Sequence, residues 1–264
     1  EYKFLITLVK EVKTMLAKKS YGLLTDKTIA ATMRKLKANN FSVVFADNSE
    51  VALRTVLDLV PHNAIVGMGD SATVKQIGMV AALASRGTKV IDPTGVKELT
   101  ISRSKQGVFK QELKRALTCD IFITGCNAVT LDGKLVSTDR VGNRVAGMVF
   151  GPDKVILIVG RNKIVRNVDE AVQRIRDVIA PAHAKQKLKK TPCVKTGRCT
   201  DCDAPDRICN VTTIIEKKPL YTDVTIVLIN EDLGLGWNPL WSKERVNRIR
   251  SRYEEVTWAF FTSD

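Results

Sequence analysis

Four cysteines near residue 200 give the strongest chemical signal in the sequence. They follow the pattern Cys-x5-Cys-x2-Cys-x6-Cys and are Cys193, Cys199, Cys202 and Cys209. A Cys-x2-Cys step lets two thiolates reach one metal centre from a single tight turn, and basic side chains beside it favour the thiolate form. The segment 189–210 has no periodic apolar face, so a bound metal would supply the stability that burial cannot. We therefore expect a metal-binding insertion, with free cysteines or two disulfides as the alternative.

The spacing of these cysteines also bears on the identity of the metal. Structural zinc sites usually carry two short Cys-x2-4-Cys steps, and this segment has only one. Loops of five and six residues suit the larger iron–sulfur cluster, whose corners lie further apart. We expect a cluster of the 4Fe-4S type, which would do redox chemistry. Zinc is the alternative, and it would stabilise the loop without doing redox chemistry.

The glycine-rich loop that follows the apolar run 64–67 is a candidate anion site. Its candidate residues are Gly67, Gly69, Asp70, Ser71 and Thr73. Glycines let backbone amides approach an anion, and the two hydroxyls can donate hydrogen bonds. Ala72 stands where a dinucleotide fingerprint has its third glycine, and no Gly-Lys-Ser/Thr is present, so neither common nucleotide loop fits. A tight turn with a helix cap explains the same residues and remains the alternative.

A second polar segment follows the apolar run 121–124. Candidate catalytic residues are Cys126, Asn127, Asp132 and, further along, Lys163. Candidate anion-binding residues are Gly125, Asp139, Gly142, Asn143 and Arg144. An arginine here could clamp a carboxylate or phosphate through two hydrogen bonds. Three residues have plainer alternatives: Cys126 as packing, Asp132 in a hairpin turn, and Lys163 as a solvated lysine.

The remaining cysteine and the two histidines are not expected in the site. Cys119 precedes the strand 121–124 and is predicted to pack as a small apolar residue. His62 precedes a strand and His183 follows a helix end, and neither has an obvious partner in the sequence. Both are predicted to be caps or surface histidines.

The elements that must position these residues alternate along the chain. Helices are predicted over 4–16, 29–36, 51–59, 73–85, 113–117, 169–179 (ended by Pro181) and 243–253. Strands are predicted over 41–45, 64–67, 88–91, 121–124, 155–159, 211–215 and 224–229. The run 155–159 is apolar throughout, as in a strand buried on both faces of a parallel sheet. The sequence therefore predicts an α/β fold with a Rossmann-like, parallel-rich sheet, N-terminal helices and the cysteine-rich insertion.

Composition limits the class of protein. The 264 residues suit one domain, which we divide into 1–60, a sheet core 61–188, the cysteine-rich loop 189–210 and 211–264. The net charge is +14, which could serve nucleic acid, an acidic partner or small anionic substrates. Because the basic residues are scattered and few aromatic residues lie among them, nucleic acid is disfavoured and a solvated basic surface is the better interpretation. No apolar run of about 18 residues is present, so no membrane span is predicted. Six cysteines without a secretory signal indicate the cytoplasm.

Three blocks of sequence resemble the lactate-utilization (LUD-domain) family. They are GCNAVTLDGKLVSTDRVGNRVAGMVFGPDKVILIVGRNKIV, APAHAKQKLKKTPCVKTGRCTDCDAPDRICN and VLINEDLGLGW. The resemblance covers about residues 1–240 and implies a fold similar to ribose-5-phosphate isomerase, glucosamine-6-phosphate deaminase and CoA-transferases. It also implies a part in the oxidation of L-lactate to pyruvate through iron–sulfur partner subunits.

The segment 124–146 is also similar to a stretch of methylthioribose-1-phosphate isomerase. The matching residues are Gly125, Asn127, Gly133 and Gly142. The catalytic aspartate of that family falls on Asn127, and an amide cannot act as a base, which argues against the isomerase mechanism. Cys126 or Asp132 would have to substitute.

Three functions are compatible with these patterns. The first is a redox component that binds a small carboxylate such as lactate. The second is a non-redox, isomerase- or transferase-like enzyme acting on a small anionic carboxylate or phosphate. The third is a non-catalytic assembly subunit. Iron–sulfur partner subunits or a second copy of the chain are the protein partners compatible with the sequence.

Overall fold

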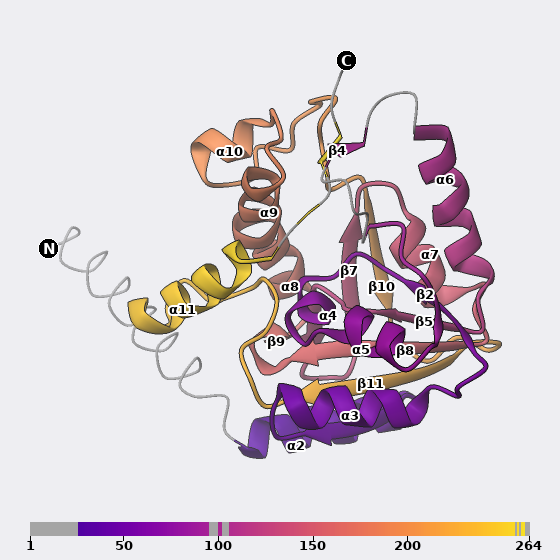
Figure 1. The fold of residues 1–264 in the computed structure, drawn as a ribbon. Coiled ribbons are helices and arrows are strands. Elements are labelled where there is room, and N and C mark those ends of the chain that lie inside the picture. The colour runs from indigo at the N-terminus through magenta and orange to yellow at the C-terminus, as the bar shows by residue number, and fades with distance from the viewer. Residues whose placement is uncertain (1–25, 95–99, 102–105, 257, 259, 262–264) are drawn as a thin grey trace, which may run out of the picture.

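The computed structural model describes residues 26–94, 100–101, 106–256, 258 and 260–261 (Figure 1). Its helices are α2 (Asp26–Ala38), α3 (Ser49–Leu59), α4 (Ala72–Gln76), α5 (Met79–Ser85), α6 (Gln106–Arg115), α7 (Asn143–Val149), α8 (Val168–Arg174), α9 (Ala180–Gln186), α10 (Pro192–Thr196) and α11 (Lys243–Glu254). Its strands are β1 (Ser42–Ala46), β2 (Ile65–Met68), β3 (Lys89–Ile91), β4 (Thr100–Ile101), β5 (Ile121–Thr124), β6 (Ala128–Thr130), β7 (Leu135–Asp139), β8 (Lys154–Gly160), β9 (Ile164–Val165), β10 (Val211–Ile215), β11 (Asp223–Ile229) and β12 (Phe260–Phe261). The helix predicted over 4–16 lies outside the described residues.

A six-stranded parallel sheet forms the centre of the molecule, in the order β1-β11-β8-β5-β2-β3. Strand β8 lies inside this sheet, and its side chains alternate between two separate apolar cores. Val155, Leu157 and Val159 belong to one core, whereas Ile156 and Ile158 belong to the other. Because successive side chains point to opposite faces, the continuous apolar run predicted a strand covered on both sides. The parallel α/β prediction is confirmed.

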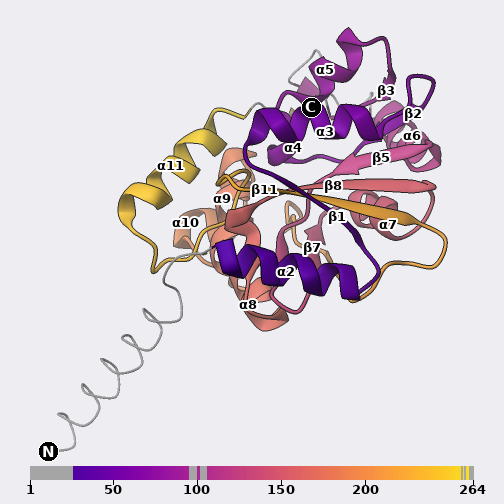
Figure 2. The ribbon, with the colours of Figure 1, turned by 90° about the horizontal axis from the view of Figure 1, so that it is seen from below.

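Helices cover both faces of this sheet. Ala52 and Val56 of α3 pack in one core, and Ile29 and Leu36 of α2 pack in the other. Figure 2 shows α2 and α3 on opposite sides of the strands. Within the described part of the chain, no helix combines the length and the apolar character needed to cross a membrane.

A second, smaller sheet has the order β10-β7-β6-β9. Strands β6 and β7 pair antiparallel across a tight turn, and β10 pairs antiparallel with the other side of β7. Gly133 takes a φ of +83° in that turn, a value that glycine adopts without strain. The N–H of Gly133 donates to the carbonyl of Thr130, which closes the hairpin.

Two predicted helices differ from the structure. The helix expected over 73–85 is divided into α4 and α5, because Gly78 between them has a φ of +70°. Pro181 was expected to end a helix, but α8 continues through the π-helical segment Ile175–Ile179 into α9. A proline ring clashes with the carbonyl four residues earlier, and a wider π-helical turn before Pro181 relieves that clash.

The strand order reverses direction beside β2. From β2 the chain moves outward to β3 at the edge, and then returns to form β5 on the other side of β2. In open parallel sheets, ligands bind in the crevice outside the carboxyl ends of the strands at such a reversal. The loops after β2 and β5 are therefore the first place to look for a site.

Candidate functional site

A cavity of about 850 Å³ lies at this reversal. The loops that follow β2, β5 and β8 contribute Asp70 and Ser71, Gly125, Cys126 and Asn127, and Lys163 respectively. Helices α6 and α9 and residue Trp258 complete its wall. A cavity of this size accommodates a small-molecule ligand. The structure thus brings the two polar segments of the sequence together.

Most of the predicted site residues line this cavity, and five do not. The lining ones are Asp70, Ser71, Gly125, Cys126, Asn127, Asp139, Asn143, Arg144 and Lys163. Those outside the lining are Gly67, Gly69, Thr73, Asp132 and Gly142. Each of these five has a structural role in the strands, turns and helix ends around the cavity.

The glycine-rich loop combines a turn with part of the cavity wall. A methyl group on Gly67 would lie 2.4 Å from the carbonyl oxygen of Ala116, so this glycine permits close packing behind the loop. Ser71 caps α4 by accepting a hydrogen bond of 3.5 Å from the amide of Val74. Thr73 is fully buried inside α4. The turn-and-cap interpretation therefore accounts for Gly67 and Thr73, whereas Asp70 and Ser71 also reach the cavity.

Asp132 lies in the hairpin turn between β6 and β7, away from the cavity. Its carboxylate accepts a short hydrogen bond from the hydroxyl of Thr130 and lies 3.5 Å from Nζ of Lys134. The plainer hairpin interpretation holds for Asp132 and Gly133. Gly142, with a φ of +93°, similarly serves as the N-cap of α7.

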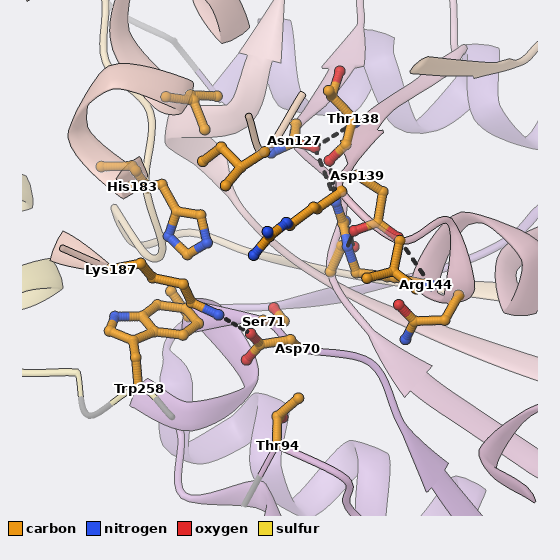
Figure 3. Close-up of a pocket in the computed structure, with 18 of the residues that line it drawn as sticks. Asp70, Ser71, Thr94, Asn127, Thr138, Asp139, Arg144, His183, Lys187 and Trp258 are labelled. Atoms are coloured by element: carbon orange, nitrogen blue, oxygen red, sulfur yellow. Dashed lines mark hydrogen bonds and ion pairs between the residues drawn. The ribbon is translucent and has the colours of Figure 1, made fainter. Parts of the chain in front are cut away.

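The guanidinium of Arg144 is held mainly by acceptors of the protein itself (Figure 3). It donates to the carbonyl oxygen of Gly125 at 2.9 Å, to that of Thr138 at 2.7 Å and to Oδ1 of Asn127 at 3.2 Å. The carboxylate of Asp139 lies 3.9 Å from Nε. The guanidinium is thus not free to clamp a ligand through two hydrogen bonds, as the sequence had suggested. Arg144 instead fixes the loop after β5 against β7 and adds positive charge to the wall.

Asp70 forms an ion-paired cluster at the opposite side of the cavity (Figure 3). Nζ of Lys187 donates to its carboxylate at 2.7 Å, and Nζ of Lys75 lies 3.6 Å away. Both ammonium groups lie 4.8 Å from the ring centre of Trp258. Burial raises the pKa of Asp70, but the two lysines outweigh burial and lower it to about 2. Asp70 is therefore ionised at neutral pH and unsuited to act as a general acid.

His183 lines the cavity, so the prediction of a cap or surface histidine is wrong. Its Nδ1 makes a short hydrogen bond with the hydroxyl of Tyr253. Its ring lies edge-on to that of Trp258, with the ring centres 4.8 Å apart (Figure 3). Burial, with the nearby charge of Lys187, lowers the pKa of His183 to about 3. The imidazole is therefore neutral at physiological pH, and a pKa this low makes it a hydrogen-bonding group rather than a general base.

Lys163 lines the same cavity and is only 5% exposed. Its Nζ donates to the carbonyl oxygen of Cys126 at 2.9 Å. Burial lowers the pKa of Lys163 to about 8, and the charge of Arg144 acts in the same direction. Burial also raises the pKa of Cys126, whose side chain is therefore a thiol at neutral pH. The burial of Lys163 excludes the alternative of a solvated lysine, and Cys119 packs in the core as predicted.

The four clustered cysteines surround a second, small pocket. All four line it, together with Ala180 and Pro181 at the start of α9. All four are free thiols. Burial and the charges of the other three cysteines raise the pKa of Cys209, and Arg207 lowers it. As they stand, these side chains are not arranged to hold a metal ion, and the same is true of every group of three or more His, Cys, Asp or Glu among the described residues.

The donor set nevertheless fits a thiolate-bound group. It consists of four sulfurs, and thiolates are the ligands of iron–sulfur clusters and of many zinc sites. The amide of Asp201 donates to the sulfur of Cys199 at 3.3 Å. Arg207 donates to the carbonyl oxygens of Cys202 at 2.6 Å and Cys209 at 3.3 Å, which brings a positive charge beside the sulfurs.

The cysteine-rich loop also forms part of the cavity wall. Ile208 lines both the cysteine pocket and the large cavity. Asp206 lines the cavity and lies 3.7 Å from Arg140 and 3.8 Å from Lys189. The amide of Asn210 donates to the carbonyl oxygen of Asp139 at 3.0 Å, which fastens the end of the loop to β7. The two pockets are therefore neighbours with a shared wall.

Comparison with known proteins identifies the family. The chain is similar to the crystal structure of a DUF162 family protein from Deinococcus radiodurans, with 15% identity over 77% of this chain and 96% of that chain and a TM-score of 0.43. No curated protein matches the sequence. The family model of the LUD domain matches residues 29–229, which include most of the chain and the whole central sheet. The protein is a member of the LUD domain family.

Proposed function

We propose that this protein is a redox component in the oxidation of a small 2-hydroxycarboxylate such as L-lactate. In this proposal the large cavity binds the carboxylate, and the four cysteines hold an iron–sulfur cluster beside it. The observation that carries the proposal is the shared wall, in which Ile208 lines both pockets. A cluster next to a ligand cavity is in a position to exchange electrons with the ligand.

The charge of the cavity supports an anionic ligand. Among the described residues, six basic and three acidic side chains line it, an excess of three. The basic ones are Lys110, Arg140, Arg144, Lys163, Lys187 and Lys189, and the acidic ones are Asp70, Asp139 and Asp206. A cleft lined by one sign of charge raises the local concentration of oppositely charged ligands. A carboxylate is therefore favoured over a neutral compound of the same shape.

The cysteines would hold the cluster and His183 would hydrogen-bond the ligand. Oxidation of a 2-hydroxycarboxylate to a 2-oxocarboxylate releases two electrons and two protons, and a bound cluster would carry the electrons one at a time to an iron–sulfur partner subunit. The neutral imidazole of His183 lines the cavity and would hydrogen-bond the ligand. Tyr253 holds that ring in place through Nδ1.

Metal analysis of anaerobically purified protein tests the cluster. We expect iron and sulfide in similar amounts and a brown colour that dithionite bleaches. Cys202→Ser should lose most of the iron, whereas Cys119→Ser, which replaces a buried cysteine outside the pocket, should keep it. A colourless wild-type protein with bound zinc would exclude the redox role.

Calorimetric titration tests the ligand class. L-lactate and pyruvate should bind, the neutral amide of lactate should bind at least about tenfold more weakly, and binding should weaken with added salt. Equal affinity for lactate and its amide would contradict the anionic site. Oxidation of lactate by the purified protein with an artificial electron acceptor would exclude a non-catalytic assembly subunit.

A non-redox enzyme resembling isomerases or transferases is a second candidate. It is favoured by Lys163, because an amine with a pKa of about 8 in the cavity wall can act in proton transfer without a metal. The departure at Asn127 argues against the known isomerase mechanism, and its Oδ1 already accepts hydrogen bonds from Thr138 and Arg144. Turnover of a phosphorylated sugar or a coenzyme A ester by protein lacking all four clustered cysteines would favour this candidate.

A further inference from the structure

Lys163 differs from the other enclosed lysines of the cavity in its partners. Lys187 is paired with Asp70 at 2.7 Å, and Lys189 lies 3.8 Å from Asp206. For Lys163, no carboxylate among the described residues lies within ion-pair distance, and its ammonium donates only to the backbone carbonyl of Cys126. A buried ammonium without a counter-ion is costly, so structures usually avoid it away from functional sites.

The end of the Lys163 side chain packs beside the backbone of two glycines at the cavity wall. A methyl group on Gly234 would lie 2.4 Å from Oγ1 of Thr73 and 2.9 Å from both Nζ and Cε of Lys163, so the end of the lysine packs directly against bare backbone. A methyl group on Gly125 would lie 3.6 Å from the same Nζ and 2.6 Å from Oγ of Ser71. The amine and the Ser71 hydroxyl therefore approach the same point on the wall, and both line the cavity.

The protonation of Lys163 suits a nucleophile. With a pKa of about 8, about one molecule in ten carries the free amine at pH 7, against fewer than about one in a thousand for an ordinary lysine. Desolvated lysines of this kind form imines with carbonyl compounds, since the unprotonated amine is the attacking species.

We propose that Lys163 binds a carbonyl ligand covalently as an imine, and that the ligand is a small 2-oxo acid such as pyruvate or glyoxylate. The lone pair of Nζ attacks the carbonyl carbon and forms a C–N bond while the C=O π bond becomes a hydroxyl group. Loss of that hydroxyl as water then forms the C=N bond. In balance, one ammonium and one carbonyl compound give one iminium and one water, with no oxidant or reductant.

Neighbouring groups serve the two parts of this ligand. The excess of basic side chains around the cavity favours the carboxylate. Oγ of Ser71 accepts a hydrogen bond from Val74, so its own hydrogen remains to be donated to the departing hydroxyl. The choice of a 2-oxo acid rests on the proposed function, whereas imine formation requires neither iron nor the four cysteines.

Reductive trapping tests the proposal. The full-length protein is incubated with pyruvate or glyoxylate and sodium borohydride, digested, and mapped by mass spectrometry. We expect a single main adduct on Lys163, formed faster as the pH rises through about 8 because the free amine increases. Lys163→Met and Lys163→Arg should reduce trapping to the level found without the oxo acid.

Lys154 provides a matched control. It begins the strand β8 that Lys163 follows, and its Nζ likewise donates to a backbone carbonyl, that of Leu59 at 3.0 Å, but it does not line the cavity. Lys154→Met should keep the full adduct. Adduct spread over several exposed lysines, or no adduct on Lys163 in protein that binds pyruvate, would overturn the proposal.

Two further outcomes separate this inference from the proposed function. If Lys163→Met does not fold, the peptide map of the wild-type protein still decides which lysine is modified. Protein with all four clustered cysteines replaced by serine should still be trapped at Lys163. Trapping in a wild-type protein that never binds iron would support the imine and exclude the redox role. A wild-type protein that contains iron but is not trapped at Lys163 would support the redox role and exclude the imine.

Discussion

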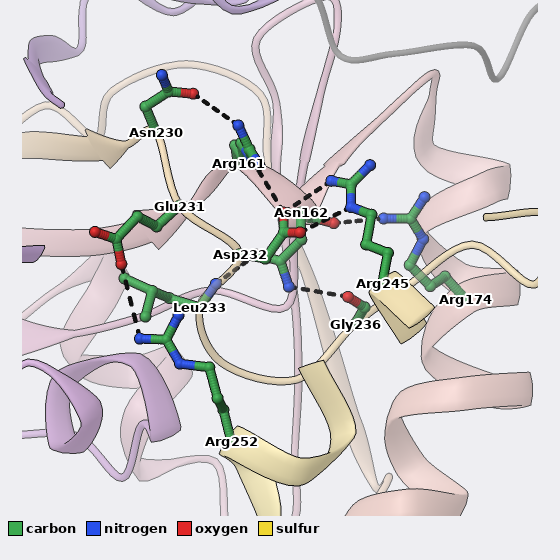
Figure 4. A network of polar contacts seen from close by, with 10 residues as sticks. All are labelled: Arg161, Asn162, Arg174, Asn230, Glu231, Asp232, Leu233, Gly236, Arg245 and Arg252. Atoms are coloured by element: carbon green, nitrogen blue, oxygen red, sulfur yellow. Dashed lines mark hydrogen bonds and ion pairs between the residues drawn. The ribbon is translucent and has the colours of Figure 1, made fainter. Parts of the chain in front are cut away.

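The three residues after β8 lie in two regions that differ in how their polar groups are partnered. Arg161 and Asn162 point into a network with the segment 230–236, which follows β11 (Figure 4). Lys163, the next residue, points into the cavity and has only a backbone carbonyl as partner among the described residues. Consecutive residues thus serve a closed polar network and an open cavity.

The network has a partner for each charged group that it buries. Asp232 accepts from Arg245 twice at 2.7 Å and from Arg161 at 3.2 Å. Asn162, fully buried, donates to the carbonyl of Gly236 at 2.9 Å and accepts from the amide of Leu233 at 3.0 Å. Complete pairing fixes the loop after β11 and therefore the far wall of the cavity. The comparison teaches that complete pairing marks the scaffold, whereas the unpaired charge of Lys163 stands out within a cavity whose other buried charges have partners.

The largest effect is expected from breaking the network at Asn162. Asn162→Ala leaves the amide of Leu233 and the carbonyl of Gly236 buried without partners, and we expect a loss of about 3 kcal/mol in the free energy of unfolding. Urea denaturation measures it. Asn230→Ala is the control, because Asn230 is only half-buried and accepts one long bond from Arg161, so its loss should stay below about 1 kcal/mol. Similar losses of unfolding free energy in both variants would show that the buried pairing of Asn162 does not stabilise the network.

A pH-dependent effect, smaller per pH unit than the loss at Asn162, is expected at His183. Its pKa is about 3 in the folded protein and about 6.5 in an unfolded chain, so the unfolded state takes up an extra proton as the pH falls between those values. The free energy of unfolding should therefore fall by up to about 1.4 kcal/mol for each unit by which the pH drops within that window. His183→Gln should flatten this slope, measured by urea denaturation from pH 7 to pH 4.

The other histidine of the chain serves as the control. His62 is exposed and lies outside the cavity, so His62→Gln should leave the slope unchanged. A slope that does not change in His183→Gln would mean that the cavity wall does not keep this imidazole neutral.

The smallest effect, with the opposite sign, is expected from Lys163→Met. Removing a buried cation that lacks a counter-ion should raise the free energy of unfolding at pH 7 by up to about 1 kcal/mol. Between pH 8 and 10.5 the unfolded wild-type chain binds more protons at this lysine than the folded one, so wild-type stability rises and the difference should shrink. A loss as large as that of Asn162→Ala would contradict the distinction between the two regions.

The sequence predicts the scaffold of the site better than its chemistry. Strand β8 is evident from its apolar run, and the two polar segments could be expected to meet because the carboxyl ends of parallel strands lie at one edge. The occupied guanidinium of Arg144 could not be predicted, because two of its acceptors are backbone carbonyls, which sequence does not distinguish.

Two further differences depend on long-range structure. His183 meets Tyr253 across 70 residues of sequence, so no local spacing reveals the pair. The helix also continues past Pro181, because a π-helical turn relieves the clash that the sequence rule assumes. Alanines at 180, 182 and 184, which leave room for a closely packed helix, are the one signal that this segment lies inside the fold.

Helix α9 contributes residues to the walls of both pockets and so connects them. Ala180 and Pro181 border the sulfurs, and His183 borders the ligand cavity one turn further along. A ligand that shifts this helix from one pocket would also move residues of the other pocket. Wherever such coupling exists, each ligand changes the affinity for the other by the same factor.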